Sequence, residues 1–390
     1  MTGGSNKKQT TAPEGVGHRK SRQIIGLDLL RLLAALSVVL YHYCYQTSIA
    51  GRDAYKFSMG IIAFPDLAFF AQYGWMGVPA FFVISGFVIS FSASATTPSK
   101  FLAARILRLG PAVWLCAPLT AIFIVLSGQN SIPSTLGRLF NSMAFFPLGS
   151  QIDGVYWTLS IEVAFYTCVF LILIFSNFSL FYKYICLIAT ISATFNILIN
   201  AGYEQLNFSG KWTNLLLIRH GCEFAVGALA YHLYHNGVRL HRLIFLTIAI
   251  VGSYAETASY SPPFFIWTVF LMVFAVTIAA NGQVLRLLSD PQRRLIRELG
   301  KATYPLYLVH QIVGVYLLYL LVEAGMSPYA ALTSTFVLIF TLTGLICWAE
   351  ERMRDRLRPS VIRLCDRLVS KKRATDFDGN GVDAEAYIRR

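Results

Sequence analysis

Long runs of apolar residues dominate the chain, and short polar segments separate them. Ten of these runs approach the length of about 20 residues that a helix needs to cross the hydrocarbon core of a bilayer. They lie near residues 24–48, 68–92, 109–127, 154–175, 180–201, 213–235, 241–257, 263–280, 303–324 and 328–349. The pattern predicts an all-α polytopic membrane protein with about ten transmembrane helices.

Charged residues are scarce and unevenly placed. Asp, Glu, Lys and Arg make up 14% of the 390 residues, whereas soluble domains carry about 25%. If the N-terminus is cytoplasmic, the segments on that side hold 27 of the 33 Lys and Arg residues and the opposite loops hold four. Because Lys and Arg in short loops mark the cytoplasmic side, both termini are expected there. The net charge of +13 then reflects membrane orientation, not nucleic-acid binding.

Composition divides the chain into three parts. Residues 1–23 form a basic cytoplasmic segment without the apolar core and cleavage pattern of a signal peptide. Residues 24–349 form the membrane domain. In the cytoplasmic tail, residues 350–390, the spacing over 350–373 predicts a basic amphipathic helix on anionic lipid headgroups. Residues 376–387 begin like a calcium loop but have Tyr387 where the bidentate Glu belongs, so a polar end is expected instead.

No metal is expected from the cysteines and histidines. The seven cysteines lie mostly in apolar runs and form no C-x-x-C pair, which favours packing residues over a zinc site or a disulfide framework. The spacing of His18, His232, His235 and His241 also indicates no metal site.

The first apolar run, GLDLLRLLAALSVVLYHYCY, carries Asp28, Arg31 and His42. A charged residue at the bilayer centre costs about 2.5 to 3.5 kcal/mol on insertion scales, so such residues face a protein interior or a wet cavity. Arg31 and His42 are eleven positions apart, which places them on one helix face, roughly 16 Å apart along the axis. The face predicts a polar cavity. A topological arginine anchor and a histidine that snorkels to the outer surface explain it equally well.

Glu162 lies about two turns inside the outer end of the fourth run, in DGVYWTLSIEVAFY. An acid buried there needs a partner or a proton, so it is a functional candidate, with His42 or Arg31 as the expected partner. Tyr156 and Trp157 beside it suit either a substrate site or an interfacial aromatic belt.

Two further segments offer binding groups toward the middle and the cytoplasmic side. In KFLAARILRLGPAVW, Arg105 and Arg108 are one turn apart and form a fork suited to phosphate, although cytoplasmic arginines are also common topology signals. In GVPAFFVISGFVISFS, Ser85 and Gly86 form a notch of small residues, where a narrow substrate or simply another helix can approach closely.

Two later segments are more ambiguous. In LLLIRHGCEFAVGALAYHLY, Arg219 and Glu223 are spaced i, i+4, and we expect them to neutralise each other. In GKATYPLYLVHQIVGVY, Tyr304, Tyr307 and His310 share one side of a helix. His310 is expected either to orient a ligand or to be a hydrogen-bonded histidine of the bundle.

Taken together, these segments resemble acyltransferase family 3, integral membrane proteins that move acyl groups onto sugars and related acceptors. The matching segments, in order, are GLDLLRLLAALSVVLYH, GVPAFFVISGFVIS, Arg105 and Arg108 with Pro111, VYWTLSIEVAFY, Arg219 with Glu223, Phe224 and Gly227, and ATYPLYLVHQ. They cover most of the chain. The sequence departs from the family at Leu32, where glycine is frequent, and at Leu109 and Gly110, where an aromatic residue often precedes the proline.

The resemblance implies an enzyme of the bacterial inner membrane that uses acyl-CoA, with acetyl-CoA the expected donor. The acceptor would be a hydroxyl of a glycan, an exopolysaccharide or a glycosylated lipid. We expect His42 to act as general base, Glu162 to orient it, and Arg31 to stabilise charge or position the donor. Arg105 and Arg108 would bind the phosphates of CoA. Ser85, Tyr156, Trp157, Tyr307 and His310 are the expected substrate-binding residues.

Two other classes of protein compete with this interpretation. A transporter of a polar solute or lipid-linked sugar also needs many spans and buried charges, although no inverted half-repeat is evident. A purely structural membrane scaffold leaves the buried ionisable residues unexplained. The sequence does not specify the acyl group, the acceptor, or whether transfer passes through an acyl-enzyme.

Overall fold

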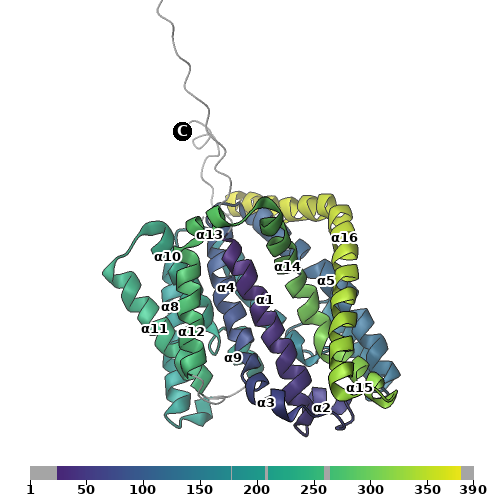
Figure 1. Cartoon of the computed structure of the whole chain (residues 1–390). Helices are drawn as coiled ribbons and strands as arrows, with labels where there is room; N and C mark the ends of the chain where they lie inside the picture. The colour runs from purple at the N-terminus through teal and green to yellow at the C-terminus, as the bar shows by residue number, and fades with distance from the viewer. Residues whose placement is uncertain (1–23, 177, 207–209, 259–263, 379–390) are drawn as a thin grey trace, which may run out of the picture.

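The computed structural model describes residues 24–176, 178–206, 210–258 and 264–378, which form a bundle of helices and contain no strand (Figure 1). The α-helices are α1 (Ile25–Leu40), α2 (Asp53–Phe57), α3 (Pro65–Ala71), α4 (Gly77–Ala93), α5 (Pro98–Leu126), α6 (Ile132–Met143), α7 (Trp157–Ser176), α8 (Phe181–Asn200), α9 (Gly210–Leu215), α10 (Gly221–Asn236), α11 (Leu240–Ala258), α12 (Phe264–Ala279), α13 (Asn281–Leu287), α14 (Asp290–Val309), α15 (Val315–Glu323) and α16 (Pro328–Asp378). Two π-helices, η1 (Tyr41–Tyr45) and η6 (His310–Gly314), continue α1 and α14. The predicted all-α class is confirmed.

Seven helical segments of the described residues are long and apolar enough to cross a bilayer. They are Ile25–Ser48, Pro65–Ala93, Pro98–Leu126, Gly154–Ser176, Phe181–Asn200, Asp290–Glu323 and Pro328–Ser370. The pair α12 and α13, bent by 71°, makes an eighth if it counts as one span. The predicted count of ten is therefore not confirmed. The two predicted spans that are missing from this count correspond to α10 and α11, neither of which is both long and apolar enough to be counted. These two helices pack against α8 and against each other.

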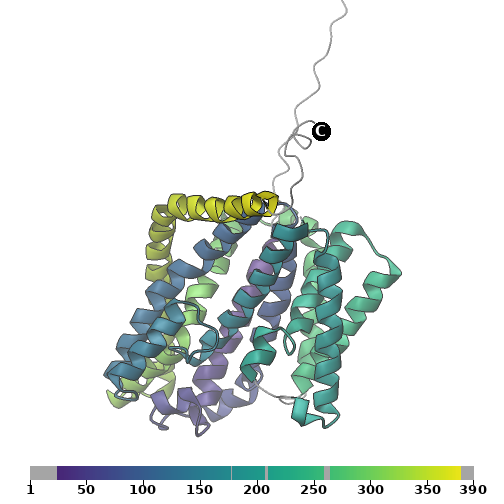
Figure 2. The same cartoon turned by 180° about the vertical axis from the view of Figure 1, so that it is seen from behind.

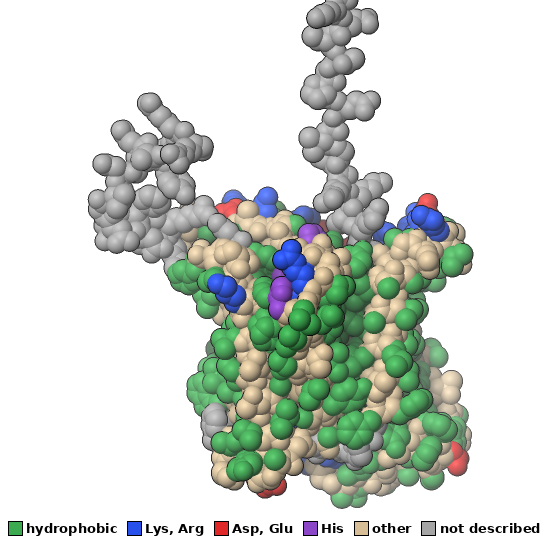
Figure 3. All heavy atoms as spheres, turned by 90° about the vertical axis from the view of Figure 1, so that its left-hand side faces the viewer, with side chains coloured by type: hydrophobic (Ala, Val, Ile, Leu, Met, Phe, Trp, Pro, Cys, Tyr) green, Lys and Arg blue, Asp and Glu red, His purple; other side chains and the backbone are tan. Residues whose placement is uncertain are grey.

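The outer surface matches the membrane setting. Most of the long helices run between the same two ends of the bundle, in the front view and from behind (Figures 1 and 2). On the face shown in Figure 3, hydrophobic side chains cover the middle, and the visible Lys, Arg and His side chains gather toward the end that carries the last part of α16. Side chains that face lipid must be apolar, so this distribution fits an integral membrane protein.

Two helices extend well beyond the apolar runs that predicted them. Helix α5 begins at Pro98, a residue suited to the first helical turn, so Arg105 and Arg108 lie inside a 29-residue helix and not in a loop. Helix α14 begins at Asp290, where Ser289 and Gln292 form a capping box that satisfies the first backbone N–H groups.

The last helix bends sharply at the end of the bundle (Figure 1). Helix α16 is continuous over 51 residues and contains Pro359, and its final part lies across the end of the bundle (Figure 1). In that part Cys365 is buried, whereas the neighbouring Leu364 and Leu368 are exposed. The predicted basic segment 1–23 and the end of the calcium-like loop lie outside the described residues.

Helices α4 and α10 approach each other through two glycines. A Cβ added at Gly86 would collide with the carbonyl oxygen of Phe224, and one added at Gly227 would collide with the carbonyl oxygen of Val83. The two backbones are therefore in direct contact, as small residues permit between membrane helices. This contact sets the distance between α4 and α10.

Substituting Gly86→Ala or Gly227→Ala should separate α4 from α10 and destabilise the protein by about 1 to 3 kcal/mol, because overpacking forces the backbones apart. Thermal unfolding of the detergent-purified protein measures the effect as a lower Tm. Gly137→Ala in α6 is the matched control, because open space surrounds that position. An unchanged Tm in both α4 and α10 variants would contradict the contact.

Candidate active site

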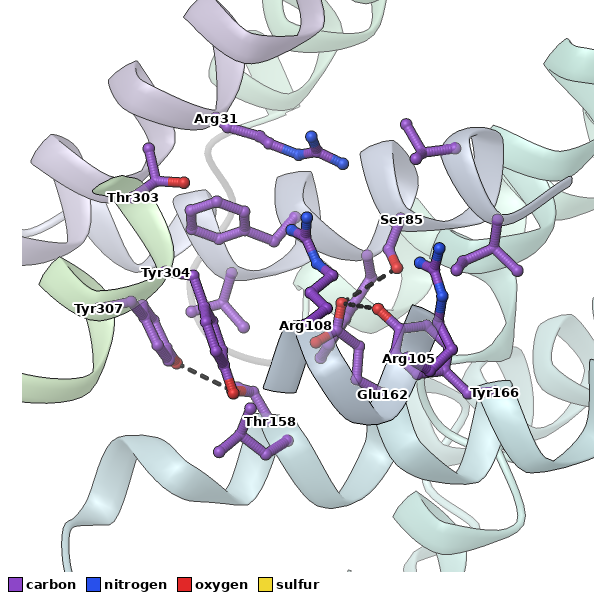
Figure 4. A pocket seen from close by; sticks show the side chains of 16 residues that line it. Arg31, Ser85, Arg105, Arg108, Thr158, Glu162, Tyr166, Thr303, Tyr304 and Tyr307 are labelled. Atoms are coloured by element: carbon purple, nitrogen blue, oxygen red, sulfur yellow. Dashed lines mark hydrogen bonds between the residues drawn. The ribbon is translucent and has the colours of Figure 1, made fainter. Parts of the chain in front are cut away.

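One cavity in the bundle is lined by three arginines, Arg31, Arg105 and Arg108, and has a volume of about 70 Å³ (Figure 4). We refer to it as the arginine cavity. Its residues come from α1, α4, α5, α7 and α14, so segments from Arg31 to Tyr307 meet there. Four charged residues that would be costly in contact with lipid, the three arginines and Glu162, therefore line one cavity.

The carboxylate of Glu162 lies at the centre of a hydrogen-bond network in this cavity. The hydroxyls of Ser85 and Tyr166 both donate to Glu162 Oε1, at 3.1 Å and 2.7 Å (Figure 4). The Arg105 guanidinium lies over the rings of Phe101 and Tyr166, at 5.3 Å and 5.5 Å from their centroids. Its Nε is buried without a hydrogen-bond partner among the described residues. Arg105 is therefore held in place with a donor still available.

Positive charge exceeds negative charge around the arginine cavity. Arg31 Nη1 lies 3.4 Å from Asp28 Oδ1, so this guanidinium has a partner. Glu350 also acts on Arg108 but is paired with Arg354 at 3.2 Å. Asp28 and Glu162 therefore balance two of the three arginines, which leaves one positive charge in excess among these described residues. Guanidinium groups bind phosphate and carboxylate through paired N–H donors. The arrangement is suited to binding an anion.

A second cavity, with a volume of about 480 Å³, is lined by His42, and we refer to it as the histidine cavity. Aromatic and amide side chains make up much of its wall: Tyr45, Tyr73, Trp75, Trp157, Gln72 and Gln311. Val78, Phe82 and Tyr307 line both this cavity and the arginine cavity. The two cavities are therefore neighbours, and these three side chains lie between them.

His42 lies in the π-helix η1 and is paired with an amide. Its Nδ1 lies 2.6 Å from Gln46 Oε1. Because a carbonyl oxygen only accepts hydrogen bonds, Nδ1 carries the hydrogen and Nε2 keeps its lone pair. A neutral imidazole fixed in this tautomer can accept a proton at Nε2.

His310 faces His42 from a second π-helix, η6, with the two ring centroids 5.0 Å apart. His310 Nδ1 donates to the Tyr307 carbonyl oxygen at 2.8 Å, and its Nε2 is buried with no hydrogen-bond partner in the described part of the chain. Single π-turns are frequent at functional sites. Here two of them bring two imidazoles together.

Asp153 fixes the position of the π-helix that carries His310. Its Oδ1 accepts from Val155 N and its Oδ2 from Ile312 N, both at 3.1 Å. Burial raises the pKa of Asp153 to about 7, against the lowering effect of these two backbone donors. The residue joins the start of α7 to the segment after α14.

Two expected pairings differ in the structure. The hydrogen bonds of Glu162 go to Ser85 and Tyr166, and Gln46 takes the place beside His42 that Glu162 was expected to hold. Arg219, expected to neutralise Glu223, has Glu256 as an ion-pair partner, with 3.6 Å between Arg219 Nε and Glu256 Oε1, while its charge also acts on Glu223. His42 thus pairs with a residue four positions later in the chain, and Arg219 contacts a carboxylate of another helix.

The other predicted site residues are distributed over both cavities. Arg31, Arg105, Arg108, Glu162 and Ser85 line the arginine cavity, His42 and Trp157 the histidine cavity, and Tyr307 both. Tyr156 and His310 are buried and line neither cavity. Sequence reasoning missed Gln46, although its i, i+4 spacing from His42 was a usable signal, and it did not combine Arg31 with Arg105 and Arg108.

Comparison with known proteins identifies the family. The exopolysaccharide production protein ExoZ of Rhizobium meliloti (strain 1021) is 28% identical to this chain over 258 residues, which cover 61% of this chain and 75% of that protein. Nodulation protein 10 of Rhizobium leguminosarum bv. viciae is 28% identical over 172 residues, which cover 38% of this chain and 43% of that protein. No solved structure matches the chain.

The acyltransferase domain family matches residues 24–349, which include every residue that lines the two cavities. The resemblance seen in the sequence is thereby confirmed. The chain belongs to acyltransferase family 3 and is an integral membrane acyltransferase.

Proposed function

We propose that the protein transfers an acyl group, with acetyl the expected one, from acyl-CoA to a hydroxyl of a glycan or glycosylated lipid. One observation carries this proposal: the arginine cavity and the histidine cavity share Val78, Phe82 and Tyr307 within one bundle. A donor held in the first and an acceptor held in the second would meet at these side chains. The name of one relative refers to exopolysaccharide production, which supports a polysaccharide acceptor.

The charge and the volume of the arginine cavity suit part of the donor. Three guanidiniums with one positive charge in excess suit the phosphates of CoA. A cavity of about 70 Å³ is far below the roughly 300 to 1,000 Å³ of sites that enclose a whole ligand of drug size. The nucleotide part of CoA would therefore lie outside the cavity, while a phosphate or the thioester arm enters it.

The volume and the lining of the histidine cavity suit the acceptor. Its volume of about 480 Å³ falls within the range of small-molecule sites. Flat aromatic faces such as those of Trp75 and Trp157 suit the apolar faces of a sugar ring, and the amides of Gln72 and Gln311 suit its hydroxyls. An acceptor sugar would lie beside His42.

The reaction follows from these positions. The acceptor O–H gives its proton to His42 Nε2 while its oxygen attacks the thioester carbonyl carbon, so the C–O bond forms. The C–S bond then breaks, and the CoA thiolate leaves and takes the proton from His42. Gln46 would hold the imidazole in the required tautomer. Arg31 lies in the arginine cavity and would position the donor.

The two cavities also suggest a direction of transfer. Arg31 lies in the second turn of α1, and His42 follows the opposite end of that helix. If the N-terminus is cytoplasmic, as the distribution of Lys and Arg favours, the donor binds from the cytoplasm and the acceptor from the other side. This arrangement fits the inner membrane of a bacterium.

His42→Ala should lower kcat by about 100-fold or more, because general acid–base catalysis contributes about 10² to 10⁴. Purified protein, labelled acetyl-CoA and candidate glycans provide the assay, and a pure transporter would yield no acylated product. His235→Ala, at an exposed histidine, is the matched control. CoA affinity should stay the same in both variants, and near-normal turnover of His42→Ala would remove His42 from the mechanism.

Gln46→Leu and Glu162→Gln should affect different kinetic constants. Loss of the hydrogen bond to His42 should lower kcat about tenfold in Gln46→Leu, with little change in the donor KM. Glu162→Gln should instead raise the donor KM, since Glu162 belongs to the arginine cavity. The reverse assignment, with kcat lowered only in Glu162→Gln, would restore Glu162 as the residue that acts on His42.

Arg105→Gln and Arg108→Gln should each weaken CoA binding about 10- to 100-fold, because a hydrogen bond to a charged group is worth about 1.5 to 3 kcal/mol. Isothermal titration of the purified protein with CoA measures this loss. Arg297→Gln, at an exposed site on α14, is the control. If all three variants bind CoA equally well, the arginine cavity is not the donor site.

A further inference from the structure

We propose that His220, Glu223 and Glu256 bind a divalent metal ion of the zinc and manganese class. One ligand atom from each residue, an imidazole nitrogen or a carboxylate oxygen, lies within 4.8 Å of the other two. His220 is the residue before α10, Glu223 lies in the first turn of α10, and Glu256 lies near the end of α11. The packing of α10 against α11 therefore assembles the three ligands.

Two of the three groups, Glu223 and His220, lack the hydrogen-bond partners that buried polar atoms normally have. Glu223 is fully buried, and neither of its carboxylate oxygens has a hydrogen-bond partner in the described part of the structure. The same holds for Nδ1 of His220, which is 5% exposed. An unpaired buried carboxylate is costly, so such groups are found paired or bound to metal. These atoms point to a ligand that they share.

The charges around the cluster also favour a cation. Two carboxylates face one guanidinium, because Arg219 Nε lies 3.6 Å from Glu256 Oε1. One negative charge remains inside the protein. A divalent ion would reverse this excess to one positive charge, which suits an anionic or hydroxyl oxygen as a further ligand.

The identity and accessibility of the ligands narrow the class of metal. One imidazole and two carboxylates are typical of zinc and other first-row transition metals, whereas magnesium and calcium prefer oxygen ligands alone. The rings of Phe82 and Trp157 lie 5.4 Å and 5.3 Å from the ring of His220 and limit its orientation. His220 and Glu256 also line the histidine cavity, so the remaining coordination positions face that space.

The main alternative is that Glu223 and Glu256 share a proton. That arrangement removes the excess negative charge without an ion, but it leaves His220 Nδ1 without a hydrogen bond, 3.6 Å from Glu256 Oε1. Spacing along the chain does not indicate a metal at these positions, because Glu256 lies 33 residues after Glu223 and only the fold brings them together. The proposal concerns binding alone and does not depend on acyl transfer.

Metal content tests the proposal directly. The full-length protein, purified in detergent, is stripped with a chelator, loaded with Zn²⁺, freed of excess ion and measured by elemental mass spectrometry. One zinc per chain is expected for the unmodified protein and for the His235→Ala control, and less than a tenth of that for Glu223→Gln and Glu256→Gln. In the unmodified protein, Co²⁺ should give the visible absorption of a site with nitrogen and oxygen ligands.

Three outcomes would overturn the proposal. The first is less than a tenth of a zinc per chain in the unmodified protein. The second is a full equivalent retained by both Glu→Gln variants. The third is that neither the unmodified protein nor Glu223→Gln binds metal and that Glu223→Gln has the higher Tm. That result would show that Glu223 and Glu256 share a proton instead. The result for the unmodified protein is decisive even if a variant fails to fold.

Discussion

A charged side chain cannot be left in contact with lipid tails, and this constraint organises the whole bundle. Polar residues on a membrane helix must point inward and find partners there. In this protein the inward-facing charges of α1, α5 and α7 meet in the arginine cavity, where Asp28 and Glu162 balance part of the positive charge. The excess that remains is what makes the cavity suitable for an anion such as a CoA phosphate.

The same constraint gives His42 polar neighbours of its own. Arg31 lies in α1, and His42 lies in the π-helix η1 that continues α1 at its other end. The neighbours of His42 there are Gln46 and His310, and not the carboxylate of Glu162. A neutral amide fixes the tautomer of an imidazole without holding it in the protonated form, so the ring remains available to accept a proton. Phosphate binding would then hold one end of the donor, and base catalysis would act on the acceptor hydroxyl beside the donor's other end, near Phe82 and Tyr307.

Composition and local spacing predicted much of the fold and part of the site. Apolar runs identified the all-α membrane class, and the cost of burying Arg31, His42 and Glu162 marked them as candidates. The count of ten spans is not confirmed at α10 and α11, because length and hydropathy alone do not decide whether a short or polar helix crosses the membrane. Partners across helices could not be predicted, as Arg219 shows: its spacing favours Glu223, but packing places Glu256 beside it.

The most direct test of the account is a cryo-electron microscopy map of the protein with a non-hydrolysable acyl-CoA analogue. We predict density for phosphate beside Arg105 and Arg108, with the acyl end directed past Phe82 and Tyr307 toward His42. Phosphates bound in the histidine cavity, or an acyl end that points away from His42, would contradict it.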